Sequence, residues 1–120
     1  MSAKKILSVG QCNMDHASIS LVLRGLGVEV TRANTAADAL KSLKGGAYSL
    51  VLVNRIFDAD GDSGLALIKK VKAEVPEQPV MLVSNYADAQ KEAQAAGAVP
   101  GFGKSALDRP EILEALKGYV

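Results

Sequence analysis

The sequence predicts an α/β fold in which a mostly parallel sheet is covered by helices on both faces. Two observations support this class. Short apolar runs alternate along the chain with helix-like segments, and residues 50–53, Leu-Val-Leu-Val, are apolar without interruption. A strand that helices cover on both faces has no solvent-facing positions, so an uninterrupted run is typical of a central parallel strand. A chain of 120 residues is long enough for one core, and we expect one domain over residues 1–120.

Five apolar runs are the candidate strands. They cover residues 5–9, 28–32, 50–54, 80–84 and, more weakly, 101–103. Residues 28–31 alternate between apolar and polar side chains, which indicates a strand nearer the edge of the sheet.

The segments between these runs carry helix signals. Thr35 precedes Asp38 by three residues, which is the spacing of a capping box, and a glycine pair ends that segment. The next segment covers residues 65–75 and stops at Pro76. The apolar residues predicted to face the core are Leu40 and Leu43 in the first segment, Leu65, Ile68 and Val71 in the second, and Ile112, Leu113 and Leu116 near the C-terminus.

Two later helices differ in how firmly we expect the core to hold them. Residues 87–96 are mostly alanine with Gln, Lys and Glu, so this helix covers little apolar area and is the predicted mobile element. Asp108 is a candidate N-cap for the last helix, and Pro110 is tolerated in the first turn of that helix.

Composition and charge exclude several classes of protein. Hydrophobic residues make up 48% of the chain and charged residues 22%, as in a soluble protein, and no apolar stretch is long enough to span a bilayer. The 14 basic and 13 acidic side chains give a formal charge of +1 and the lysines are scattered, so we expect no direct binding to nucleic acid. The N-terminus has no apolar segment of secretory-signal length, so we expect a cytoplasmic location without membrane contact.

The candidate functional residues follow the apolar runs, because ligands of open parallel sheets bind beyond the C-terminal ends of the strands. Those residues are Gly10, Gln11, Asn54, Ser84 and Lys104. Asn54 is the most informative of them. A carboxylate at this place could bind a metal ion and attack phosphorus, whereas an amide lacks both the charge and the nucleophilic oxygen.

Four stretches make the chain resemble a bacterial response-regulator receiver domain of the CheY-like superfamily from end to end. They are residues 4–9 (Lys-Lys-Ile-Leu-Ser-Val), 48–54 (Tyr-Ser-Leu-Val-Leu-Val-Asn), 81–84 (Met-Leu-Val-Ser) and 97–104 (Gly-Ala-Val-Pro-Gly-Phe-Gly-Lys). The resemblance implies a flavodoxin-like, doubly wound parallel sheet of five strands in the order 2-1-3-4-5. In that family an acidic pair after the first strand binds magnesium, and an aspartate at the tip of the third strand accepts the phosphoryl group. A Ser or Thr and a Lys on the fourth and fifth strands complete the site.

Only half of that site is carried over to this chain. Gly10 and Gln11 stand where the acidic pair belongs, and Asn54 stands where the phosphoacceptor belongs, while Ser84 and Lys104 are retained. Magnesium prefers carboxylate oxygens, so we expect no metal at this site and no aspartyl-phosphate chemistry. The resemblance therefore implies a degenerate pseudo-receiver that is not an enzyme and needs no cofactor. A Lys facing the altered pocket should be met by the Asn54 amide oxygen, by Ser84 or by backbone carbonyls.

Further departures surround the site. Ser105 follows Lys104 where the family usually has Pro, and the aromatic switch position of the family is Gly101, with Phe102 one place later. The loop after the third strand is about two residues longer than the family's common form. We therefore expect neither activation by phosphorylation nor the conformational switch of an aromatic side chain that is usual in the family.

Other patterns in the sequence have simpler explanations. Asp58, Asp60 and Asp62 alternate as calcium-loop ligands do, but the sixth and twelfth loop positions are Ser and Lys instead of Gly and Glu, so we interpret the loop as a solvated acidic turn. Cys12 is interpreted as a small buried filler and His16 as a residue without a metal or catalytic role.

Three functions stay open. The resemblance favours phosphorylation-independent interaction with a signalling partner, which would be a kinase, an output domain or another receiver, through residues 87–96, 101–103 and 109–119; a homodimer can use the same face. The second is a conventional receiver whose acceptor is Asp58 or Asp60. The third is a flavodoxin-like module that binds an anion or nucleotide near Gly10, Arg55 and Lys104.

Overall fold

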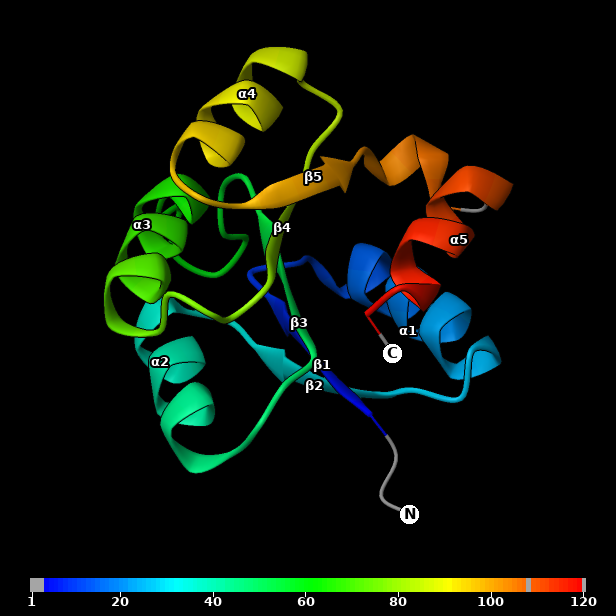
Figure 1. Ribbon diagram of the computed structural model, residues 1–120, viewed down its shortest axis with the longest axis horizontal. Helices are drawn as coiled ribbons and strands as arrows, with labels where there is room; N and C mark the ends of the chain where they lie inside the picture. The colour runs from blue at the N-terminus through cyan, green and yellow to red at the C-terminus, as the bar shows by residue number, and fades with distance from the viewer. Residues whose placement is uncertain (1–3, 108, 120) are drawn as a thin grey trace.

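Five parallel strands form one sheet in the order β2-β1-β3-β4-β5 in the computed structural model, which describes residues 4–107 and 109–119 (Figure 1). The strands are β1 (Lys5–Val9), β2 (Glu29–Ala33), β3 (Leu50–Asn54), β4 (Val80–Val83) and β5 (Val99–Phe102). The helices are α1 (Asn13–Gly25), α2 (Ala36–Gly45), α3 (Gly64–Glu74), α4 (Ala87–Ala95) and α5 (Pro110–Lys117), with a 3-10 turn at Lys104–Ala106. The predicted fold class and strand order are confirmed.

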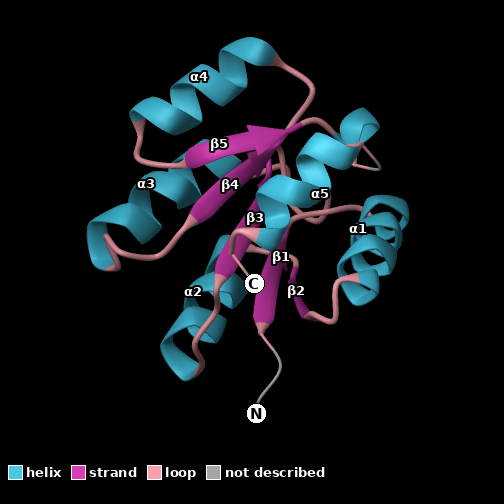
Figure 2. Ribbon diagram, turned by 45° about the vertical axis from the view of Figure 1, so that its right-hand side comes forward, coloured by secondary structure: helices cyan, strands magenta, loops and turns pink. Residues whose placement is uncertain are grey.

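Helices lie on both faces of the sheet (Figure 2). Alternate residues along β1 and β3 point to opposite faces, so the core has two halves. Leu7, Val51 and Val53 pack with helices α2, α3 and α4, whereas Ile6, Leu50 and Leu52 pack with α1 and α5. All five residues of β3 are buried, as expected for the middle strand of the sheet.

Strand β5 begins earlier than the sequence indicated. Val99 pairs with Met81 and Phe102 pairs with Val83, and the register shifts between these pairs. The prediction of a weak run at 101–103 was wrong at its start because Pro100 and Gly101 interrupt the apolar pattern. An edge strand tolerates a proline, since one side of its backbone has no ladder partner.

Several helix predictions also need correction in detail. In α2 the fully buried residue is Ala39, and Leu40 and Leu43 are only partly buried. In α3, Ile68 and Val71 are buried as predicted, but Leu67 is buried instead of the partly exposed Leu65. On α5 only Leu116 is fully buried.

The helix caps follow the chemistry of their residues. Thr35 Oγ1 accepts a hydrogen bond from the Asp38 N–H at 3.1 Å, which confirms the predicted cap of α2. The predicted cap of α5, Asp108, lies outside the described residues, and Pro110 opens that helix at its first position. Within residues 4–107 and 109–119, no helix is long and apolar enough to cross a membrane.

Candidate functional site

A pocket of about 520 Å³ opens at the C-terminal ends of the central strands. Three of the residues predicted from the strand ends line it, namely Asn54, Ser84 and Lys104. Its other lining residues are Cys12, Asp15, Arg55, Ile56, Asp58, Val83, Asn85 and Tyr86. Gly10, Gln11 and Gly101, which were also predicted from the sequence, do not line it.

Asn54 ends β3 and is only 7% exposed. Its side-chain amide nitrogen donates to the Gly10 carbonyl at 2.9 Å and to the Ile56 carbonyl at 2.7 Å. The amide thus joins the loop after β1 to the loop after β3. Both partners are acceptors, so this place requires a donor, which a carboxylate is not.

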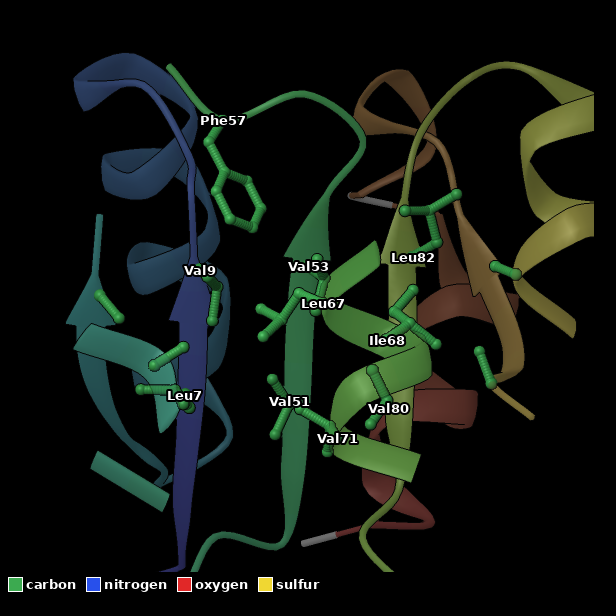
Figure 3. Packing of buried hydrophobic residues seen from close by; sticks show 14 residues of the cluster. Leu7, Val9, Val51, Val53, Phe57, Leu67, Ile68, Val71, Val80 and Leu82 are labelled. Carbon is green, nitrogen blue, oxygen red and sulfur yellow. The ribbon is translucent and has the colours of Figure 1, made fainter. Parts of the chain in front are cut away.

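Gly10 turns the chain out of β1 with a positive φ of 75°. A Cβ atom at Gly10 would overlap the aromatic ring of Phe57, which is 1% exposed. Figure 3 shows the Phe57 ring between the ends of β1 and β3, above Val9 and Val53. The Phe57 ring therefore fills the space that a side chain at position 10 would need.

Gln11 lies deeper than its position after β1 suggested. The residue is 1% exposed, and its side-chain amide has no hydrogen-bond partner among the described residues. Its backbone carbonyl accepts a hydrogen bond from the Arg32 guanidinium at 3.1 Å. Gln11 therefore contributes no ligand atom to the pocket.

Lys104 pairs with a carboxylate that the sequence did not point to. Its Nζ lies 2.6 Å from Oδ2 of Asp15, in the first turn of α1, and this bond holds the pKa of Asp15 below its usual value. The expectation that the Asn54 amide, Ser84 or backbone carbonyls would meet Lys104 was wrong. Ser84 Oγ instead accepts from the Tyr86 N–H at 3.2 Å.

Cys12 is half-buried at the rim of the pocket, so its interpretation as a buried filler was incomplete. Its Sγ lies 3.4 Å from the Asp15 N–H and caps the N-terminus of α1. Arg55 lies above the Tyr86 ring at 4.7 Å from its centroid, a cation–π contact. Both basic residues of the pocket, Arg55 and Lys104, thus have partners within the chain.

The position predicted as the switch, Gly101, lies under α4. The Gln90 side-chain nitrogen donates to the carbonyls of Leu82 at 2.8 Å and Ser84 at 3.1 Å, and a Cβ at Gly101 would overlap the Leu82 carbonyl. Phe102 is 5% exposed and packs in the core half under α1 and α5. In this arrangement no aromatic side chain can stand at position 101.

Comparisons with known proteins agree with this geometry at the level of the fold. No family model matches the sequence. The transcriptional regulatory protein ZraR of Escherichia coli K12 is 31% identical over 85 residues, which cover 69% of this chain and 19% of ZraR, so the chain spans about a fifth of the length of this curated relative.

Solved structures match over nearly the whole chain. A putative response regulator from Chloroflexus aurantiacus is 22% identical with a TM-score of 0.87, and 98% of each chain is covered. The chain has the receiver fold. A response regulator from Thermotoga maritima is 25% identical with a TM-score of 0.81, again over 98% of each chain. The CheY-like fold implied by the sequence is confirmed, and its neighbours are response-regulator receiver domains.

The residues around the pocket at the strand ends do not fit a magnesium ion. Asn54 presents its NH₂ group to carbonyls, Gly10 has no side chain, and Gln11 is buried away from the pocket. Asp15 and Asp58 are the acidic residues of the lining, and Asp15 is neutralised by Lys104. Among the described residues, no group of three His, Cys, Asp or Glu side chains could hold a metal ion.

The acidic turn after β3 is organised by its own side chains. Asp60 Oδ1 accepts from the Asp62 N–H at 3.0 Å, and Ser63 Oγ accepts from the Ala66 N–H at 3.2 Å and so caps α3. Asp58 differs from its two acidic neighbours because it lines the pocket.

Proposed function

We propose that the chain is a receiver-like signalling domain of a two-component or phosphorelay pathway that acts through phosphorylation-independent protein–protein interaction. The observation that carries the proposal is the double donation of Asn54 to the carbonyls of Gly10 and Ile56. A carboxylate that accepted a phosphoryl group there would face two carbonyl oxygens instead of a cation. The strand tip is therefore built around an amide.

The Asp15–Lys104 ion pair supports the same proposal. A lysine in such a pocket stabilises added negative charge when it is free to approach it. Here its Nζ is already 2.6 Å from a carboxylate that belongs to α1. The cation is neutralised without any phosphoryl group, so the pocket offers no unpaired positive charge from Lys104 to stabilise one.

The receiver fold supports a proposal for the class of partner. We propose that it is a kinase, an output domain or another receiver in the cytoplasm, and that it docks on the face formed by α4, β5 and α5. The β5 and α5 part of this face carries a groove of about 480 Å³, which is lined by Pro100, Ala115 and Tyr119 and also by Met81 of β4. A homodimer through this face is one form of such an interaction.

The first prediction tests the chemistry directly. The chain is incubated with acetyl phosphate and Mg²⁺ and its intact mass is measured, beside a receiver that carries an aspartate at the tip of its third strand. We expect the control receiver to gain a phosphoryl group and this chain to keep its mass, because no aspartate stands at position 54. A phosphoryl group on any aspartate of this chain would overturn the proposal.

One observation favours a second candidate function. Asp58 lines the pocket with Ser84 and Lys104, so a carboxylate is present beside the retained family residues. If Asp58 is the acceptor, the same assay gives a mass increase that Asp58→Asn abolishes and Asp60→Asn leaves intact. Asp60 is the matched control because it lies in the same turn and does not line the pocket.

A further inference from the structure

A second groove, of about 530 Å³, lies between the N-terminal half of α4, the loop after β3 and the start of α3. Its apolar surface comes from Ile56, Leu65, Leu82 and Ala89. A ridge separates this groove from the pocket at the strand ends. The ridge consists of the three residues that line both the groove and the pocket, Arg55, Ile56 and Tyr86. The groove is also distinct from the α5 groove, with which it shares no lining residue.

Two large apolar side chains are exposed on this ridge. Ile56 is 43% exposed and Tyr86 is 62% exposed, although most large apolar residues of the described chain are buried. The Arg55 guanidinium lies 4.7 Å from the centroid of the Tyr86 ring. This contact restricts the ring in the free protein, so less side-chain entropy is lost when a partner covers it. Exposed aromatic and aliphatic side chains beside a groove are typical of an interaction site.

The rim of the groove that α4 provides is acidic. Asp88 and Glu92 are one helical turn apart on α4 and both line the groove. Neither carboxylate forms an ion pair with another residue of the described chain. The one basic lining residue, Arg55, is stacked on Tyr86. The charge that complements this rim is therefore positive.

We propose that this groove binds a basic amphipathic helix of a partner protein, with an apolar side chain over Ile56 and Tyr86 and Lys or Arg beside Asp88 and Glu92. The acidic residues line the groove from α4, and most of its apolar surface comes from the loop after β3, the start of α3 and β4, which suits an elongated occupant with an apolar face and a basic face at helical spacing. The assignment rests on the proposed protein-interaction function and names a surface and a partner chemistry for it.

The attraction is local, which makes it testable. The whole chain has a formal charge of +1, so a basic peptide gains nothing from the net charge of the protein. Removing two carboxylates from the groove rim should therefore weaken binding, and removing two carboxylates elsewhere should not.

The probe is a labelled helical model peptide of Leu and Lys, compared with a Leu and Glu peptide of the same pattern and a Leu and Lys peptide of shuffled order. Fluorescence anisotropy gives Kd, and amide chemical shifts locate the contact. We expect the patterned basic peptide alone to bind, to shift Ile56, Tyr86 and Ala89, and to lose about tenfold in affinity in Asp88→Asn/Glu92→Gln. Tyr86→Ala should weaken it by a similar factor.

The matched control is Glu74→Gln/Glu77→Gln, which removes the same charge at and just after the C-terminal end of α3, whereas the groove lies at the start of that helix. Equal weakening in this control, equal binding of the shuffled peptide, or shifts confined to other surfaces would overturn the proposal. Self-association of the chain that Asp88→Asn/Glu92→Gln abolishes, without peptide binding, would assign the groove to a second copy and also overturn it. The phosphodonor assay is independent of these results: phosphorylation would refute the proposed function, whereas an inert chain that binds no peptide refutes the groove alone.

Discussion

The Phe57 ring fills the space next to Gly10 at the end of β1. The backbone at Gly10 has a φ of 75°, and the Phe57 ring occupies the place of a Cβ atom at Gly10. An acidic residue at position 10 would meet both a backbone penalty and a steric overlap. The single substitution Gly10→Asp is therefore not a route to a metal site.

Replacement of Gly10 by alanine measures these two costs. We expect Gly10→Ala to lower the free energy of unfolding by about 3 kcal/mol, of which roughly 1–2 kcal/mol is backbone strain and the rest is overlap with Phe57. Urea denaturation provides the measurement. If the overlap is real, Phe57→Leu should cost less in the Gly10→Ala background than in the wild type, because the smaller side chain relieves the overlap.

Gly27→Ala is the control for this experiment. Gly27 has a φ of 76°, almost the same as Gly10, and a Cβ there would meet no heavy atom within 4 Å. Gly27→Ala should therefore lower the free energy of unfolding only by the cost of the backbone conformation, about 1–2 kcal/mol. Equal losses at Gly10 and Gly27, with additive behaviour of Phe57→Leu, would show that Phe57 does not exclude a side chain at position 10.

Helix α4 packs on the sheet differently from the neighbouring helix α3. The fully buried residue of α4 is Ala93, whereas α3 buries Leu67, Ile68 and Val71. Gln90 compensates in part, because its amide donates to carbonyls of β4 and of the residue after it. One polar side chain thus adds hydrogen bonds between α4 and the sheet, where the apolar packing of this helix is limited to small side chains.

Replacement of Gln90 by alanine should loosen α4 and the edge strand β5. We expect a loss of about 1–2 kcal/mol in the free energy of unfolding, because the carbonyls of Leu82 and Ser84 lose a donor. Amide hydrogen exchange should accelerate in α4 and β5 and stay unchanged in α3. Gln94→Ala is the matched control, since Gln94 is exposed one turn later on the same helix. Unchanged exchange in Gln90→Ala would contradict this role.

The helices, the strands and the residues at the strand ends could be predicted from the sequence. The residues that contact the strand-end side chains could not. The apolar run of β3 is local information, and Asn54 and Ser84 follow their runs directly. The contact of Asp15 with Lys104 joins residues that are far apart in the chain and depends on the orientation of α1. The overlap of Phe57 with position 10 likewise depends on the path of the loop after β3.

Polar groups of α1 and of the strands β1 and β2 gather where α1 covers the edge of the sheet. Ser8 and Arg32 are neighbours in the register of β1 and β2, and His16 Nε2 lies 3.4 Å from Ser20 Oγ. The Ser8 hydroxyl, the His16 Nδ1 and the Arg32 Nε are buried without a hydrogen-bond partner in the described part of the chain. Buried polar groups of this kind make the stability of a domain sensitive to charge.

The titration of His16 allows the effect of charge on the stability of the domain to be measured. Burial, followed by the positive charges of Arg32 and Arg24, holds the pKa of His16 below its usual value of 6.5. The unfolded chain therefore binds a proton more readily than the folded chain, so stability is full above pH 6.5 and falls as the pH drops toward the lower folded pKa. His16 is the one histidine in the sequence, so it should dominate this window.

We expect His16→Gln to flatten the pH dependence of the free energy of unfolding just below pH 6.5, measured by urea denaturation. Both proteins should still lose stability in stronger acid, because the Asp15 carboxylate has a folded pKa below 3.8 and its protonation breaks the pair with Lys104. Asp15→Asn should remove part of that second, more acidic loss and leave the first unchanged. Equal slopes below pH 6.5 in the wild type and His16→Gln would show that the polar cluster under α1 does not disfavour the charged imidazole.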